Sequence, residues 1–221
     1  MSELAIKLSG VHRTFDKGLV QALRGVDLEI AKGESIAIVG QSGSGKSTLL
    51  NMIGALDFPD QGEVFLFGQK ITADLDLDQV RNRRLGFIFQ LHHLIPNLTV
   101  LENVELALKP RKLSKAERSE RSKELLIKVG LEHRMDFLPV KISGGERQRA
   151  AVARALVTDP DLILGDEPTG SLDSTTGRSL MSLIEELSVG QGKSLVVVTH
   201  NEEFASRLSR TVKITDGLIE V

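Results

Sequence analysis

Residues 36–47 read Ile-Ala-Ile-Val-Gly-Gln-Ser-Gly-Ser-Gly-Lys-Ser, and this stretch decides the fold. Its first four residues form a short continuous apolar run, typical of a strand buried on both faces of a parallel sheet. The glycine-rich segment after it has the spacing G-x-x-x-x-G-K-[ST], the P-loop pattern. The apolar residues that follow recur on one face of a predicted helix, and they are Leu49, Leu50, Met52, Ile53 and Leu56. The segment therefore has the strand, turn and helix context that the pattern requires.

A P-loop predicts a nucleotide site, because its turn points backbone N–H groups at phosphates and the following helix N-terminus favours anions. We expect Lys46 to reach the β and γ phosphates of ATP and Ser47 to bind Mg²⁺. The residues predicted to bind ATP in this segment are Gly40, Gln41, Ser42, Gly43, Ser44, Gly45, Lys46, Ser47 and Thr48.

Three other predicted strands run directly into polar residues. Residues 162–164 lead to Asp166 and Glu167, residues 195–198 lead to His200, and residues 85–89 lead to Gln90. The first two of these runs are as apolar as residues 36–39, which favours a parallel sheet. Open sheets of this kind bind ligands at the carboxyl ends of their strands. The pattern therefore predicts that these side chains meet at one edge of the sheet.

Other segments predict an antiparallel layer and a helical region. Residues 26–30 and 63–67 alternate apolar and polar side chains, as do the first residues of the chain, which indicates half-exposed strands. Asp216-Gly217 between apolar pairs predicts a hairpin turn. Residues 99–130 have a helical, charge-rich pattern, and the mixed signs of residues 112–128 are typical of a solvated helix face.

A second glycine-rich stretch, here called the signature segment, covers residues 143–149 and reads Ser-Gly-Gly-Glu-Arg-Gln-Arg. With both stretches the chain resembles ABC-type ATPases over essentially its whole length. The resemblance implies an α/β P-loop NTPase with a mainly parallel core sheet, an N-terminal antiparallel β subdomain and an inserted helical subdomain at about 91–150. It also implies that residues 1–221 are one nucleotide-binding domain, and we expect neither a transmembrane segment nor a C-terminal regulatory domain.

The resemblance implies a homodimer that encloses two Mg-ATP. In this family the signature segment of one subunit closes over the ATP that the other subunit's P-loop holds. The residues that match are Ser143, Gly144, Gly145 and Glu146. The hydroxyl, the close backbone approach and the helix N-terminus that a γ-phosphate requires are all present. The chain departs from the commonest form by having Ile142 for leucine and Glu146 for glutamine.

Further roles follow from the resemblance at matching positions. Asp166 matches the aspartate that holds Mg²⁺ through water, and Glu167 matches the base that polarises the attacking water. Gln90 matches the glutamine that contacts both metal and water, and His200 the histidine that donates to the γ-phosphate. Asp173 matches the D-loop at the dimer interface, with a purely structural turn as the alternative.

Phe15 lies where the family places an aromatic residue, commonly tyrosine, that stacks on adenine. The chain has no tyrosine or tryptophan. Stacking on a ring face needs no hydroxyl, so phenylalanine can do it. A structural phenylalanine is the alternative.

Residues 86–104 resemble most closely the ATPases of bacterial lipoprotein-releasing complexes, which share paired histidines after the glutamine followed by Leu-Ile-Pro. The ATPases of macrolide or peptide export and of cell division are related. We expect membrane permease subunits to dock on an apolar groove lined by Leu91, His92, His93, Leu94 and Ile95. A metal site at the two histidines is disfavoured, because no cysteine or third ligand cluster accompanies them.

Composition agrees with this expectation. Lys+Arg 28 against Asp+Glu 30 gives a net charge of −2, so no global basic field predicts nucleic acid as a partner. The absence of cysteine fits a reducing compartment. The N-terminus lacks the pattern of a signal peptide, and no apolar run approaches the roughly 18 residues that span a bilayer. We therefore expect the chain at the cytoplasmic face of the inner membrane, held there by membrane subunits.

The predicted function is ATP hydrolysis coupled to transport, with release of lipoproteins as the favoured task. The main alternative is the same kind of ATPase in a macrolide, peptide or cell-division complex. A soluble ABC ATPase acting on DNA or ribosomes usually carries coiled-coil insertions or two cassettes, which this length does not hold. An ATP-gated module without turnover is disfavoured by Glu167, Gln90 and His200.

Overall fold

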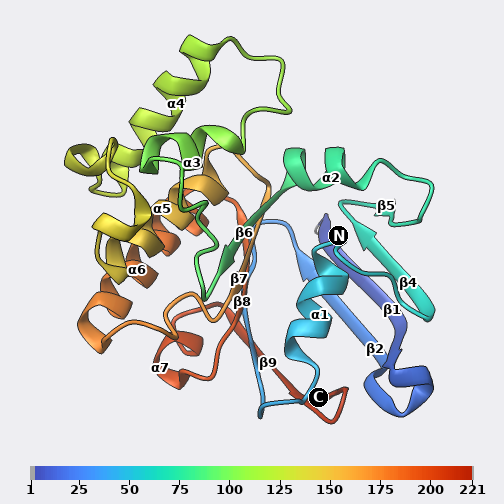
Figure 1. The fold of residues 1–221 in the computed structure, drawn as a ribbon. Helices are drawn as coiled ribbons and strands as arrows, with labels where there is room; N and C mark the ends of the chain where they lie inside the picture. The colour runs from blue at the N-terminus through green and yellow to red at the C-terminus, as the bar shows by residue number, and fades with distance from the viewer. Residues whose placement is uncertain (1–2, 221) are drawn as a thin grey trace.

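Two sheets pack against opposite sides of one helix in the computed structural model, which describes residues 3–220 (Figure 1). That helix, α1 (Lys46–Ile53), directly follows the P-loop. Its buried side chains are Leu49, Leu50, Met52 and Ile53. They belong to one hydrophobic cluster with residues of both sheets, including Ile6 and Ile38. The P-loop helix is thus fixed from two directions.

The N-terminal sheet is antiparallel, as predicted, with the strand order β2-β1-β4-β5. Its strands are β1 (Leu4–Phe15), β2 (Val20–Ala31), β4 (Gln61–Leu66) and β5 (Gln69–Lys70). A short 3₁₀ turn, Asp16–Gly18, joins the two long strands. In β1 the side chains of Ile6 and Leu8 are buried while Lys7 between them is exposed, the alternation expected of a sheet with one face in water.

The core sheet has the order β10-β9-β3-β8-β7-β6 and is parallel except for the final hairpin strand. Its strands are β3 (Ser35–Val39), β6 (Leu85–Phe89), β7 (Leu162–Asp166), β8 (Ser194–Val198), β9 (Arg210–Thr215) and β10 (Leu218–Glu220). Every residue of β8 is buried, as its continuous apolar sequence predicts. Asp216 and Gly217 have φ angles of 49° and 78°, the left-handed pair that a tight hairpin requires.

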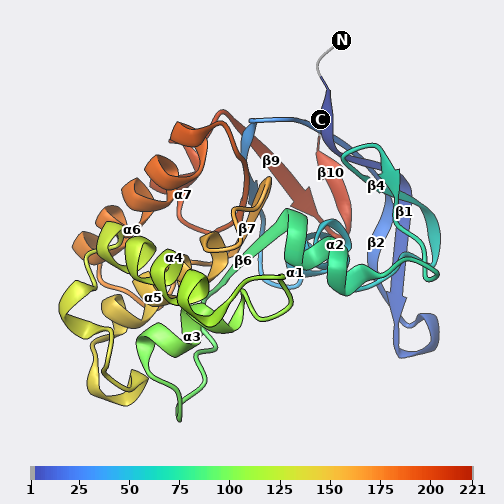
Figure 2. The ribbon, with the colours of Figure 1, turned by 90° about the horizontal axis from the view of Figure 1, so that it is seen from above.

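Helices cover the face of the core sheet that α1 leaves free (Figures 1 and 2). They are α3 (Val100–Leu106), α4 (Lys115–Lys128), α5 (Gly144–Leu156), α6 (Ser174–Leu187) and α7 (Glu202–Ala205). The short helix α2 (Leu77–Arg84) leads into β6. Three further 3₁₀ turns span Glu132–Arg134, Pro139–Lys141 and Val189–Gln191. In residues 3–220 no helix combines the length and hydropathy needed to cross a membrane.

Two local expectations were wrong. Leu56 does not lie on the buried face of α1, because the helix ends at Ile53 and the chain turns at Ala55, which has a φ of 50°. Leu56 is therefore 47 % exposed. The helical pattern of residues 99–130 is also interrupted between α3 and α4. Pro110 lies in that interval, where its missing N–H and fixed φ oppose a continuous helix.

Candidate active site

The predicted site residues converge on a cavity of about 590 Å³ at the carboxyl ends of the parallel strands. Predicted residues that line it are Phe15, Gly40, Ser42, Gly43, Gly45, Lys46, Ser47, Thr48, Gln90, Asp166, Glu167 and His200. Gln41 and Ser44 belong to the same loop but do not line the cavity. Sequence reasoning missed four lining residues, Val20, Gln21, Ala22 and Val198.

The P-loop needs glycine at two of its positions because neighbouring backbone lies against it. A Cβ on Gly40 would come 2.2 Å from the Ile214 carbonyl oxygen. At Gly45, where φ is 106°, a Cβ would come 2.4 Å from the Ala22 oxygen. The loop therefore lies tightly between β9 and β2. Lys46 crosses it, and its Nζ donates to the carbonyl oxygens of Gly40 and Gln41 at 2.8 and 2.7 Å.

Two carboxylates stand side by side where β7 ends. Burial raises the pKa of Asp166, and the neighbouring charge of Glu167 raises it further, while a hydrogen bond with Ser47 and the Lys46 ammonium act in the opposite direction. A cation near the Asp166 oxygens would stabilise the ionised form of this buried carboxyl group, which lies beside Lys46 and Ser47. The arrangement can therefore hold a metal ion next to bound phosphate.

Glu167 has a backbone that its neighbours hold in place. Its φ of 47° lies in the left-handed region, which is strained for a residue with a side chain. Its N–H donates to the Val198 carbonyl at 2.9 Å, and its own carbonyl accepts from Gly170 N at 3.0 Å. The carboxylate is 2.8 Å from Nδ1 of His200. Strand β8 and the turn after β7 thus aim one carboxylate and one imidazole at each other.

Gln90 enters the cavity directly after β6. Its side chain lies close to Gly170, where a Cβ would come 2.9 Å from Nε2 of Gln90. The turn after β7 therefore packs against the residue that follows β6, since only a glycine at position 170 leaves room for the Gln90 amide.

Phe15 reaches the cavity from the other sheet. It ends β1 and pairs with Val20 across the turn to β2, which explains why residues 20–22 line the cavity beside it. Phe15 is 40 % exposed. Gly18, at the end of the connecting turn, is the sequence feature that could have predicted this hairpin. A predicted hairpin there would have placed Val20, Gln21 and Ala22 beside Phe15.

The signature segment lies outside this cavity in the single chain. Ser143 is the N-cap of α5, and its Oγ accepts from Glu146 N at 3.2 Å while Glu146 Oε2 accepts from Ser143 N at 2.7 Å. Figure 1 shows α5 and α1 on opposite sides of the core sheet. Gly145 faces α6, since a Cβ there would come 2.7 Å from Thr176. One chain therefore presents a P-loop and a signature segment at separate places.

Asp173 has a structural role in a turn, which is the alternative to the D-loop role predicted from the sequence. Its side chain caps α6 by accepting from the backbone N–H groups of Thr175 and Thr176, both at 3.0 Å. These hydrogen bonds, led by those from Thr176, lower the pKa of Asp173. A cap does not exclude a further contact with a second subunit, so the D-loop role stays a prediction.

The predicted docking segment is held by helix α5. Gln148 Nε2 donates to the Phe89 carbonyl at 2.8 Å, and Arg147 Nε donates to Nε2 of His92 at 3.0 Å. Arg154 donates to the carbonyls of His92 and His93 at 2.7 and 2.6 Å. Sequence reasoning missed these contacts. They tie the residues after β6 to the helix that begins with the signature segment.

The two histidines of this segment point to different neighbours. His92 receives the Arg147 hydrogen bond, whereas the His93 ring lies edge-on to Phe89 with 5.2 Å between centroids. The exposed apolar surface comes from Leu91, at 65 %, and Ile95, at 39 %. Leu94 instead packs, partly buried, against the core beneath the helices.

Glu146 should make stability depend on pH. Hydrogen bonds from Arg134 and from the Ser143 backbone lower its pKa to about 2. Because this folded-state pKa lies below the ordinary value of 4.5, its stabilisation is complete above that value and is lost as the pH falls toward 2. We expect Glu146→Gln to reduce the free energy of unfolding by about 2 kcal/mol at neutral pH.

Urea unfolding of both proteins at about pH 7 and pH 3 measures this effect, with the difference shrinking at the lower pH. Glu132→Gln is a matched control, because Glu132 is exposed in the 3₁₀ turn Glu132–Arg134 and caps no helix. An equal loss for Glu146→Gln at both pH values would contradict the role of the charge.

Comparisons with known proteins agree on one family. The family model described as "ABC transporter" matches residues 23–170. A lipoprotein-releasing system ATP-binding protein, LolD, of Francisella tularensis is 46 % identical over 100 % of this chain and 98 % of that protein. An uncharacterised ABC transporter ATP-binding protein of Thermotoga maritima is 48 % identical over 97 % of this chain and 93 % of its own length.

Among solved structures, a dimer of the ATP-binding cassette MJ0796 in a post-hydrolysis state with ADP and Pi is similar to this chain. The TM-score is 0.89 with 44 % identity, and the match covers 98 % of this chain and 97 % of that one. The similarity extends over both sheets and the helices, so the predicted α/β fold with an antiparallel N-terminal layer is confirmed.

Proposed function

This chain belongs to the ABC transporter family, and on that premise we propose that it is the ATP-hydrolysing subunit of a membrane complex that releases lipoproteins from the inner membrane. The observation that carries the catalytic part is the single cavity that joins the P-loop to Gln90, Glu167 and His200. The lipoprotein task rests on the full-length similarity to LolD proteins, at 44–46 % identity.

The proposed site is shared by two copies of the chain. The P-loop, Phe15 and the carboxylates lie in one cavity, while Ser143, Gly144 and Gly145 lie elsewhere at the N-terminus of α5. A helix N-terminus with adjacent glycines suits a γ-phosphate. We propose that a second copy supplies it, as a homodimer, which the dimeric cassette structures of a similar chain support.

Each side chain of the cavity has a proposed role. Lys46 binds the β and γ phosphates, and Phe15 carries the adenine on its ring. Glu167 accepts a proton or hydrogen bond from the attacking water. An ionised Glu167 can only accept, so His200 Nδ1 donates in their contact. A neutral ring then has no proton at Nε2, and donation to the γ-phosphate requires the imidazolium or release of Glu167.

Mg²⁺ fits the oxygen donors beside the P-loop. Asp166 offers a carboxylate, Ser47 a hydroxyl and Gln90 an amide oxygen. In residues 3–220 no group of three or more His, Cys, Asp or Glu side chains could hold a metal by itself. This suits Mg²⁺, which usually takes one or two protein ligands with substrate phosphates. When bound, the ion neutralises charge on the β and γ phosphates.

The proposed membrane contact lies next to Gln90. Leu91 and Ile95 are the exposed apolar side chains there, and the arginines of α5 hold His92 and His93 between them. A short apolar helix of a membrane subunit on this surface would touch a segment that ends in the cavity. We propose that the chain is held at the cytoplasmic face of the membrane through this contact.

The test is capture of the chain with its membrane partner. We expect the tagged chain, purified from detergent-treated membranes, to co-purify with integral membrane subunits. The double variant Leu91→Asp, Ile95→Asp should lose this co-purification, because burying an unpaired charge in the contact is costly. Leu94 is left intact because it contributes to the core. In the matched control, Leu19 and Leu218 are both changed to Asp. These two leucines are 87 % and 43 % exposed and lie in other turns or strands.

Nucleotide binding should survive in both variants, since neither removes a P-loop contact. Full capture by the Leu91 and Ile95 variant would contradict the docking surface. Capture of an export or cell-division permease in place of lipoprotein-releasing subunits would contradict the proposed task but not the ATPase.

A further inference from the structure

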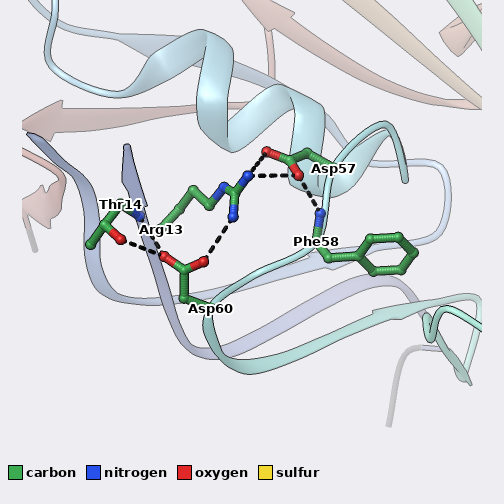
Figure 3. A network of polar contacts seen from close by, with 5 residues as sticks. All are labelled: Arg13, Thr14, Asp57, Phe58 and Asp60. Carbon is green, nitrogen blue, oxygen red and sulfur yellow. Dashed lines mark hydrogen bonds and ion pairs between the residues drawn. The ribbon is translucent and has the colours of Figure 1, made fainter. Parts of the chain in front are cut away.

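Arg13, two residues before Phe15 in β1, is fixed by two carboxylates from another part of the chain (Figure 3). Its Nη1 donates to Asp60 Oδ1 at 2.7 Å, and its Nη2 lies 3.0 and 2.9 Å from the two carboxylate oxygens of Asp57. The Arg13 side chain is only 24 % exposed. A guanidinium that bridges two carboxylates has little freedom left to move.

Both carboxylates are themselves held by backbone groups. Asp60 accepts from the N–H and the hydroxyl of Thr14 at 2.6 and 2.8 Å, and Asp57 accepts from Phe58 N at 2.8 Å (Figure 3). The hydrogen bonds from Thr14, with a smaller contribution from Arg13, lower the pKa of Asp60. The network therefore has its charges and its geometry in place before any ligand arrives.

The guanidinium of Arg13 covers one face of the Phe15 ring. Its Cζ lies 4.9 Å from the ring centroid, within the range of a cation–π contact. Phe15 lines the nucleotide cavity, but Arg13 does not. The guanidinium therefore contacts the ring without itself lining the cavity. Phenylalanine has no hydroxyl to anchor its ring, so the ring's orientation depends on what packs against its faces.

The same network connects the Phe15 ring to the P-loop helix. Asp57 and Asp60 come shortly after α1, which ends at Ile53 and begins with Lys46. The strand end that carries Phe15 is thus attached to the far end of the helix whose N-terminus meets the phosphates. This attachment fixes the separation between a platform for the base and a cradle for the phosphates.

We propose that Arg13, held by Asp57 and Asp60, is a positioning residue for the nucleotide base, acting through Phe15. The inference rests on the proposed role of Phe15 as the platform for adenine. Arg13 holds the ring so that its free face meets the base at the distance that the P-loop sets. Binding energy from the base then depends on Arg13, while binding energy from the phosphates does not.

The test is a double-mutant cycle read by calorimetric titration with ATP and, separately, with inorganic tripolyphosphate. We expect Phe15→Ala and Arg13→Ala each to weaken ATP binding roughly three- to tenfold, the range of an aromatic stacking contact. In the Phe15→Ala background, Arg13→Ala should have no further effect, because a residue that acts through another is silent once that residue is gone. Tripolyphosphate affinity should stay unchanged in all three variants.

Arg84→Ala is the matched control. Arg84 lies 5.0 Å over the Phe67 ring and pairs with Asp161 at 2.8 Å, yet it does not line the nucleotide cavity. Its loss should leave ATP affinity unchanged. Arg13→Lys keeps the charge but cannot bridge both carboxylates in the same way, so we expect ATP binding between those of wild type and Arg13→Ala.

Several outcomes would overturn the proposal. They are an unchanged ATP affinity in Arg13→Ala, an equal loss of ATP and tripolyphosphate binding, and a full additional loss in the Phe15→Ala background. If Phe15→Ala itself leaves ATP affinity unchanged, the platform role of Phe15 fails and the inference fails with it. If Phe15→Ala weakens ATP binding and Arg13→Ala does not, only the inference about Arg13 fails.

Discussion

Glu167→Gln is expected to bind ATP as well as the unchanged protein and to hydrolyse it at least about 100-fold more slowly, the effect assigned to a positioned acid or base. The amide keeps the shape of the carboxylate but cannot accept a proton. The backbone of Glu167 is held by Val198 and Gly170, so the turn should not change. Loss of a charge beside Asp166 also reduces repulsion of the phosphates, which favours retained ATP binding.

The measurements are phosphate release for turnover and calorimetric titration for binding, followed by sizing in the presence of ATP. A stable ATP-bound dimer should accumulate, because the step that ends it is slow. Glu203→Gln is the control, since Glu203 is exposed and contacts Arg178 at 3.6 Å, away from the cavity. Near wild-type turnover in Glu167→Gln would remove Glu167 from the role of base.

Local sequence patterns predicted much of the fold, because strand burial and turn conformation depend on residues that are close together in the sequence. The continuous apolar runs of residues 36–39, 162–164 and 195–198 predicted buried parallel strands, and each became part of one. Asp216-Gly217 predicted the final hairpin, since both residues adopt positive φ. Leu56 shows the limit of periodicity, because its spacing fitted the helix but the chain had already turned at Ala55.

Contacts between distant segments could not be predicted in the same way. Arg13 meets Asp57 and Asp60 across 44 and 47 residues, and no spacing rule pairs them. Arg147, Gln148 and Arg154 lie in a helix whose apolar pattern gives no sign that they hold residues 89–93. Such contacts depend on how α5 lies against β6, where a Cβ on Gly86 would come 2.4 Å from the Ala155 oxygen.

The site was predicted through motifs rather than through periodicity. The P-loop and the residues at the ends of β6, β7 and β8 meet in one cavity because parallel strands bring their carboxyl ends to one edge. Their chemical roles stay predictions, as does the helical subdomain at about 91–150. The position of Ser143 and its glycines outside the cavity is the feature on which the proposal of a second copy rests.

The second large effect concerns this shared site. We expect Lys46→Ala and Ser143→Arg each to abolish hydrolysis, the first by removing the cation that binds phosphate and the second by placing a large side chain where α5 begins. In a mixed dimer, one site combines an intact Lys46 with an intact Ser143, and the other is damaged on both sides. A random mixture should therefore regain about a quarter of the wild-type rate if the sites act independently.

Mixing the two variants and measuring phosphate release tests the shared site most directly. Different tags on the two chains verify that mixed dimers form, and a mixture of Lys46→Ala with the Lys46→Ala, Ser143→Arg double variant is the control, since no intact site can arise in it. The account predicts activity in the first mixture and none in the control or in either variant alone. Wild-type activity of either single variant, or no activity in a mixture shown to contain mixed dimers, would contradict it.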